Sequence, residues 1–161
     1  MSEAEMIRLI LEIVAAAFIG PAFAMVFGVR ERYLCCIAAT AALCRAVRSF
    51  LVMGLNFDLV IAAFIAATVV SLVYIYIAPR LRVPRPVFTA ASVICLIPGS
   101  DAYRALFALI SLVHQDSSEA LMKSIVTLFH SGMRAAAIIL AICFGIAIVP
   151  IFFYRYRHRH L

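Results

Sequence analysis

Four arginines lie inside long apolar stretches of this sequence, where charged side chains are rare. These arginines are Arg45, Arg48, Arg104 and Arg134. They outnumber the acidic residues in such stretches, which are Glu12 and Asp101. A guanidinium presents its N–H donors in a planar fork that matches a carboxylate. These residue types therefore predict the binding of a small anion in an apolar environment.

Two interpretations of the arginines stay open at this point. An arginine near the centre of a bilayer costs about 2.5 to 3.5 kcal/mol on insertion scales, so it must face protein, water or a counter-charge. In the first interpretation the arginines bind a substrate anion, and Arg45 and Arg48 share one helix face because they are three residues apart. In the second, the arginines pair with Glu12, Asp101 or backbone carbonyls, or extend toward the headgroups.

A second set of polar residues recurs at helical spacing near the C-terminus. They are Lys123, Thr127, His130 and Arg134. Intervals of four, three and four residues place them on one face of a helix. His130 is a candidate carrier of a coupled proton, as are Asp101 and Glu12, although a histidine in such a stripe is more often a hydrogen-bonding packing residue.

The elements that position these residues are membrane helices. The chain of 161 residues is 66% hydrophobic and 14% charged, and its mean hydropathy of +1.11 lies outside the range of soluble domains. Its apolar residues form runs of about 20 or more, as helices that cross a hydrocarbon core of about 30 Å require, and they do not alternate as barrel strands do. The predicted fold class is all-α, a polytopic integral membrane protein.

Five transmembrane spans can be drawn, and they form one transmembrane domain over residues 1–161. Their predicted bounds are about 7–27, 33–52, 57–78, 87–113 and 121–153. Proline removes a backbone donor and clashes with the preceding turn of a helix. We therefore expect the fourth span to break at Pro98 and the fifth to kink or end near Pro150.

The arginines between the spans predict an orientation. They gather in the segments after the first, third and fifth spans, as Arg30, Arg32, Arg80, Arg82, Arg85, Arg155, Arg157 and Arg159. The two other connecting segments contain no Lys or Arg. The positive-inside rule then places the N-terminus outside and the C-terminus in the cytoplasm.

The break in the fourth span has its own predicted geometry. Pro98 lies roughly 16 Å into the bilayer when counted from Val87 at about 1.5 Å per residue. Glycine at position 99 allows an unwound backbone, and Ser100 is a suitable N-cap for a half-helix that continues toward Val113. The N–H groups of that half-helix would point at the membrane centre, as in transporters that hold an anion. The alternative is a packing kink satisfied by neighbouring helices.

The sequence lacks the residue patterns that several classes of function need. The five cysteines show no C-x-x-C or Cys/His spacing, so no metal site and no cofactor is predicted. No Ser/His/Asp, Cys/His or paired-acid arrangement indicates a catalytic centre, so an enzyme is not predicted. The net charge of +6 is explained by the loop arginines, and no basic face with aromatic side chains indicates nucleic-acid binding. The first run lacks a basic n-region and is not expected to be a cleaved signal peptide.

One motif connects the fourth predicted span to a known family. It reads Pro86-Val87-Phe88-Thr89, then Pro98-Gly99 and Ala102-Tyr103, with further similar positions at Gly20–Val29, Arg48 and Gly54–Asp58. This pattern resembles the threonine/serine exporter family, specifically the small five-span subunit of its split bacterial members. The resemblance implies an exporter subunit in the bacterial inner membrane that works with a larger homologous membrane subunit. It implies substrates that carry a carboxylate, threonine and serine for fused members and succinate for split ones, and it places Arg48, Pro98, Gly99 and Tyr103 at the binding site.

Two functions are carried forward. The first is a transporter subunit that exports a small carboxylate, bound by Arg48 and the half-helix at Ser100 with help from Arg45, Arg104 or Arg134. The second is a non-transporting assembly or regulatory subunit that docks a partner. Small residues at four-residue spacing in the first span, Ala16, Gly20 and Ala24, suit close helix contacts within this chain, with a partner or in a homo-oligomer.

Overall fold

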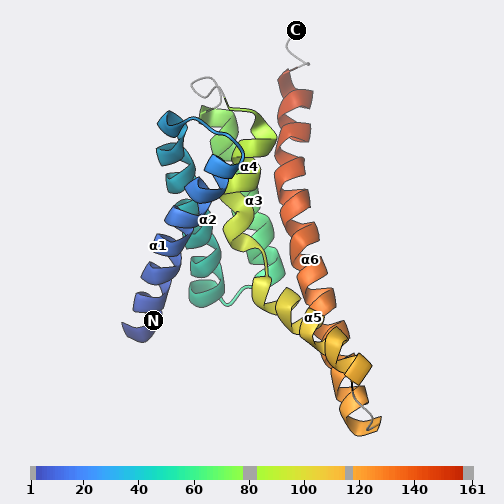
Figure 1. Ribbon diagram of the computed structural model, residues 1–161. Helices are drawn as coiled ribbons and strands as arrows, with labels where there is room; N and C mark the ends of the chain where they lie inside the picture. Colours follow the sequence, from blue (N-terminus) through green and yellow to red (C-terminus); the bar gives the residue numbers. More distant parts are fainter. Residues whose placement is uncertain (1–2, 78–82, 115–117, 158–161) are drawn as a thin grey trace. The chain divides into compact units, whose positions relative to one another are not determined.

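A computed structural model describes residues 3–77, 83–114 and 118–157 of the chain (Figure 1). Within these ranges the chain forms helices joined by short turns and no strand, which confirms the all-α fold class. The elements are α1 (Glu3–Val26), the 3-10 turn η1 (Glu31–Tyr33), α2 (Leu34–Leu55), α3 (Leu59–Ile77), α4 (Arg85–Val93), the 3-10 turn η3 (Ile94–Leu96), α5 (Gly99–His114) and α6 (Ser118–Arg157).

The helices are long and apolar enough for a polytopic membrane protein. Four stretches of the described residues meet that requirement alone: Met6–Val26, Glu31–Leu55, Leu59–Ile77 and Ser118–Phe153. A fifth span results if Arg85–Leu96 and Gly99–Val113 together form one broken span. The predicted interruption of the fourth span at Pro98 is therefore confirmed.

Part of the predicted orientation depends on residues outside the described ranges. Arg80, Arg82 and Arg159 belong to this group. The orientation and the assignment of the whole chain to one transmembrane domain both stay predictions.

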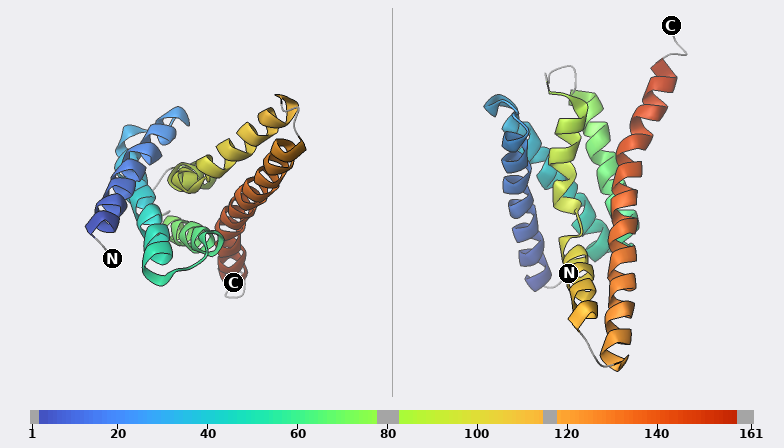
Figure 2. Two further views of the ribbon diagram at one scale, coloured as in Figure 1. Left: turned by 90° about the horizontal axis from the view of Figure 1, so that it is seen from below. Right: turned by 45° about the vertical axis from the view of Figure 1, so that its right-hand side comes forward.

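The chain divides into two compact units, Met1–Leu96 with Ala141–Leu161, and Ile97–Leu140. In the first unit α1 packs along α2, and α2 packs against α3 (Figure 2). Helix α4 contacts all three of these helices. The second unit contains α5 and the N-terminal part of α6.

Two glycines mark the closest helix contacts of the first unit. A Cβ atom at Gly20 of α1 would lie 2.7 Å from the Cβ of Ala41 on α2. A Cβ at Gly145 of α6 would lie 2.6 Å from the carbonyl oxygen of Phe64 on α3. Because apolar surface gains little by leaving lipid, such close backbone packing is the main source of helix association in a membrane.

A partly buried polar contact connects α3, α4 and α6 in the first unit. Pro150 has no N–H, so the carbonyl of Ile146, four residues earlier in α6, lacks its helical donor. That carbonyl accepts from Ser71 Oγ at 3.1 Å and from Arg85 Nη2 at 3.1 Å, and Arg85 Nη2 also donates to Ser71 Oγ at 2.8 Å. Arg85, counted above among the loop arginines, therefore points into the helix packing.

Helix α2 ends at a residue with left-handed backbone geometry. Asn56 has φ 51° and ψ 33°, and its N–H donates to the carbonyl of Leu51. Glycine adopts this conformation most easily, and asparagine tolerates it better than most residues that carry a side chain. This turn sets the position of Leu59, where α3 begins.

Candidate functional site

The interruption of the fourth span has a different geometry from the predicted one. Helix α5 begins at Gly99, and the N–H of Ala102 donates to the carbonyl of Pro98 at 3.0 Å. Pro98 therefore precedes the helix as its cap residue, and the prediction that Ser100 is the N-cap is wrong, because Ser100 already lies in the first turn. Among the described residues only Gly28 is a glycine with positive φ. The break therefore depends on the proline and does not use the conformational freedom of Gly99.

The carbonyl groups on the other side of the break are bound by arginines of α2. The missing N–H of Pro98, together with the bond from the Gly99 N–H to the Ile97 carbonyl at 2.8 Å, interrupts the regular helical series at this point. Arg45 Nη1 donates to the carbonyl of Cys95 at 3.0 Å. Arg48 Nη1 donates to the carbonyl of Leu96 at 3.4 Å. Cations at the C-terminal end of a helix interact favourably with its dipole and with its last carbonyls.

Glu12 of α1 is the carboxylate of this cluster. Its Oε2 atom lies 3.2 Å from Arg45 Nη2 and accepts from Ser49 Oγ at 2.8 Å. Its Oε1 atom lies 3.6 Å from Nε of Arg8, whose side chain is 75% exposed, so this outer pair adds little. The interpretation in which the arginines pair with Glu12 and with backbone carbonyls is correct for Arg45.

Arg48 differs from Arg45 in its ion pairing. Only 9% of the residue is exposed, and none of the ion pairs between described residues involves it. Among the residues that the structure describes, Arg48 donates to the Leu96 carbonyl alone, and that bond is long for an N–H donor. A buried guanidinium with unused donors is costly unless another acceptor completes its surroundings.

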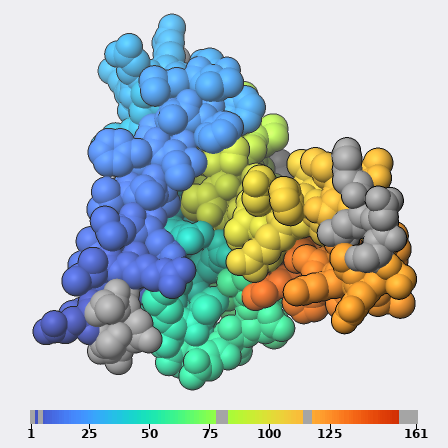
Figure 3. Space-filling view, turned by 60° about the horizontal axis from the view of Figure 1, so that its bottom comes forward, coloured from blue at the N-terminus to red at the C-terminus, as the bar shows by residue number. Residues whose placement is uncertain are grey.

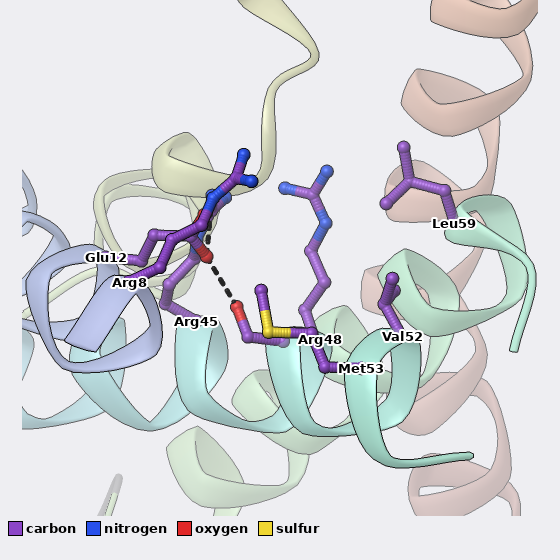
Figure 4. A pocket seen from close by; sticks show the side chains of 8 residues that line it. Arg8, Glu12, Arg45, Arg48, Val52, Met53 and Leu59 are labelled. Carbon is purple, nitrogen blue, oxygen red and sulfur yellow. Dashed lines mark hydrogen bonds and ion pairs between the residues drawn. The ribbon is translucent and has the colours of Figure 1, made fainter. Parts of the chain in front are cut away.

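Arg48 borders a pocket of about 300 Å³. The pocket lies at the end of the first unit where α1 begins and α2 leads into α3, the end turned toward the reader in Figure 3. Its lining residues are Arg8, Glu12, Arg45, Arg48, Ser49, Val52, Met53 and Leu59. In Figure 4, Arg48 stands between the charged group of Arg8, Glu12 and Arg45 and the apolar side chains of Val52 and Leu59.

The composition of this lining suits a small anion with an apolar part. Three guanidiniums face one carboxylate, so the pocket carries excess positive charge. Val52, Met53 and Leu59 are the apolar residues of the lining, and Figure 4 shows Val52 and Leu59 on the side of Arg48 away from Glu12. A carboxylate suits such a lining because charge-assisted hydrogen bonds to a guanidinium are shorter and stronger than neutral ones.

The remaining predicted site residues belong to the second unit. Asp101 Oδ2 lies 3.9 Å from Arg134 Nε, with side-chain exposures of 9% and 47%. Asp101 thus has its ion pair with Arg134, and Arg104, three residues away in α5, is exposed. Tyr103 is also exposed and stacks on Phe107, with ring centroids 6.3 Å apart. His130 is exposed on α6.

The structure therefore brings Glu12, Arg45 and Arg48 together in the first unit, whereas the other candidates belong to the second unit. Sequence reasoning missed Arg8 and Ser49 as members of the pocket lining. A signal for both was present, because Arg8 precedes Glu12 by four residues and Ser49 follows Arg45 by four, which puts each pair on one helix face.

Comparisons with known proteins identify the family of this chain and relatives of similar sequence. The family model described as Threonine/Serine exporter, ThrE, matches residues 12–152. An uncharacterized protein of Haemophilus influenzae is 31% identical over 152 residues, which is 94% of this chain and 50% of the relative. The chain thus spans about half the length of the curated relative that it matches. No solved structure matches.

Proposed function

Because the chain belongs to the threonine/serine exporter family, a family of transporters, we propose that it is a membrane subunit that exports a small carboxylate. The substrate is a dicarboxylate of the size of succinate, or threonine and serine themselves. One observation carries this proposal: Arg48 is buried at a pocket of about 300 Å³ and forms no ion pair with any residue that the structure describes. A substrate carboxylate supplies the acceptor that the described part of the chain does not place there.

The surroundings of Arg48 define what the substrate meets. The carboxylate binds the free donors of Arg48, and the rest of a short molecule lies along Val52, Met53 and Leu59. Glu12 and Arg45 neutralise each other in part, so they set the shape and charge of the pocket beside the bound group. Pro98, Gly99, Ser100 and Tyr103, with Arg104 and Arg134, stay proposed contributors from the second unit.

A larger membrane subunit of the same family is the proposed partner. The matched relative is about twice as long as this chain, so it contains a further segment of similar length. Our proposal is that a separate homologous protein supplies the corresponding part here, in the bacterial inner membrane, with the N-terminus of this chain outside. Pseudo-symmetric halves of this kind are common among secondary transporters. Assembly with further copies of this chain is the alternative arrangement.

Glu12 is the proposed proton carrier among the three candidates. It lies at the pocket and is bound to Arg45 and Ser49, so protonation would weaken the contact with Arg45 and change the charge that the substrate meets. Asp101 and His130 are the other candidates, and both belong to the second unit.

The test is carboxylate efflux from vesicles that contain the chain and its partner. Arg48→Gln keeps a polar side chain and removes the charge. Loss of a charged hydrogen-bonding partner in a buried site typically costs 2 to 5 kcal/mol, so we expect efflux of labelled succinate or threonine to fall about tenfold or more. Arg32→Gln, at an exposed arginine on η1 outside the pocket, is the matched control and should leave efflux unchanged.

Two results would contradict the proposal. Equal efflux by the Arg48→Gln and Arg32→Gln proteins, at equal amounts in the vesicles, would show that Arg48 is not part of the binding site. Full efflux by the partner alone would instead favour an assembly or regulatory role for this chain.

A further inference from the structure

Arg48 serves two parts of the first unit at once. Its Nη1 atom donates to the carbonyl of Leu96, the last residue of η3, and its side chain also lines the pocket. The same guanidinium that would bind the substrate therefore holds the end of the helix that stops before Pro98.

The two arginines of α2 hold that helix end unequally. Arg45 is fixed on both sides, with Cys95 at 3.0 Å and Glu12 at 3.2 Å. The contact of Arg48 with Leu96 is 3.4 Å, so a displacement of a few tenths of an ångström would break it. Arg45 is thus the permanent contact, and Arg48 is the one that can be lost.

A carboxylate on Arg48 weakens this contact for two reasons. A charge-assisted bond to a carboxylate is stronger than the bond to a neutral carbonyl, so the guanidinium moves toward the anion. The anion also neutralises the positive charge that stabilises the carbonyl end of a helix, and this second effect does not depend on which N–H groups the anion uses.

We propose that binding of a carboxylate at Arg48 releases the Leu96 carbonyl and so frees the end of α4 and η3, which makes Arg48 the residue that couples pocket occupancy to the break. This inference rests on the proposed function, because it needs a carboxylate in that pocket. Leu96 is followed directly by Ile97 and Pro98, so the freed end is the one through which the chain continues into α5.

A separate observation concerns the same helix. The hydroxyl of Ser92, two residues before η3 begins, is buried and has no hydrogen-bond partner among the described residues. An unpaired buried hydroxyl is unfavourable. A shift of α4 that gave this hydroxyl an acceptor would recover part of that free energy, so the unpaired hydroxyl opposes the present position of α4.

Cys95 provides a reporter at this helix end. Its thiol lies within hydrogen-bonding distance of two carbonyls, that of Ser92 at 3.6 Å and that of Ala41 on α2 at 3.8 Å, and the contact with Ala41 is lost if the end of η3 moves away. In a protein whose other cysteines, Cys35, Cys36, Cys44 and Cys143, are replaced by alanine, the rate of Cys95 modification by N-ethylmaleimide measures exposure of this end. A protein that keeps only the exposed Cys35 of α2 is the control.

We expect saturating sodium succinate or L-threonine to raise the modification rate of Cys95 about threefold or more, as loss of a charge at a helix end allows. Sodium chloride at equal ionic strength should have no effect, and Cys35 should not respond to any of them. In the Arg48→Gln background Cys95 should react at the raised rate without an anion and show no further change.

Binding is measured separately, by titration calorimetry on the same protein. Binding of succinate or threonine with an unchanged Cys95 rate would overturn the coupling and leave the proposed function intact. No binding by either would overturn the proposed function and this inference together. An unchanged rate in Arg48→Gln without anion would show that Arg48 does not hold the helix end.

Discussion

Replacing Gly145 by alanine should separate α6 from α3. A Cβ at this position would lie 2.6 Å from the Phe64 carbonyl oxygen, 2.9 Å from the Ala67 Cβ and 3.2 Å from the Thr68 backbone nitrogen. Two of these atoms are backbone, so no rotamer change relieves the clash and the helices must move apart. Overpacking of this kind costs about 1 to 3 kcal/mol, against a gain in helix propensity of up to about 1 kcal/mol for glycine to alanine.

Gly132 offers a matched control in the same helix. Its added Cβ would meet only the Cβ of Ala105, at the ordinary distance of 3.9 Å. Gly132→Ala therefore gains helix propensity and introduces no steric clash with a neighbouring helix. In reversible unfolding from mixed micelles, followed by circular dichroism, Gly145→Ala should be less stable than Gly132→Ala by about 1 kcal/mol or more. Equal stabilities would refute the close contact between α6 and α3.

Three further changes can be followed by the same unfolding measurement. Ser92→Ala removes an unpaired buried hydroxyl and should be neutral or stabilising by up to about 1 kcal/mol, whereas a loss of that size would reveal a partner for Ser92. Pro150→Ala restores the helical donor to Ile146, so Arg85→Leu should cost at least about 0.5 kcal/mol less in that background, and additive effects would contradict the contact. Asn56→Gly should retain stability while Asn56→Ala lowers it by about 1 kcal/mol, and the reverse order would exclude the left-handed turn.

The features that depend on local chemistry could be predicted from the sequence. The apolar runs predicted helices, and Pro98 predicted the interruption of the fourth span, because a missing N–H acts wherever the proline lies. The three-residue spacing of Arg45 and Arg48 placed both on one side of α2, where the structure has them bound to successive carbonyls.

The features that depend on which helices meet could not be predicted. Composition indicated an excess of buried arginine but did not tell which acid pairs with which arginine. Glu12 pairs with Arg45 across two helices, and Asp101 pairs with Arg134 although Arg104 is closer in sequence. The sequence also suggested that the break presents N–H groups to an anion, whereas its carbonyl groups are the ones that bind the arginines of α2.

The arginine contacts with helix carbonyls have a consequence for synthesis and insertion of the chain. In each case the donor precedes its acceptor in the sequence: Arg48 comes before Leu96, and Arg85 comes before Ile146. Chains are made from the N-terminus, so the guanidinium is present before the carbonyl that it binds, whether Pro150 or the break after Leu96 has left that carbonyl without its helical donor. A carbonyl without a hydrogen-bond donor finds no water in the hydrocarbon core. Because the arginine is synthesised first, its guanidinium is already available as a donor when the later helix enters the bilayer.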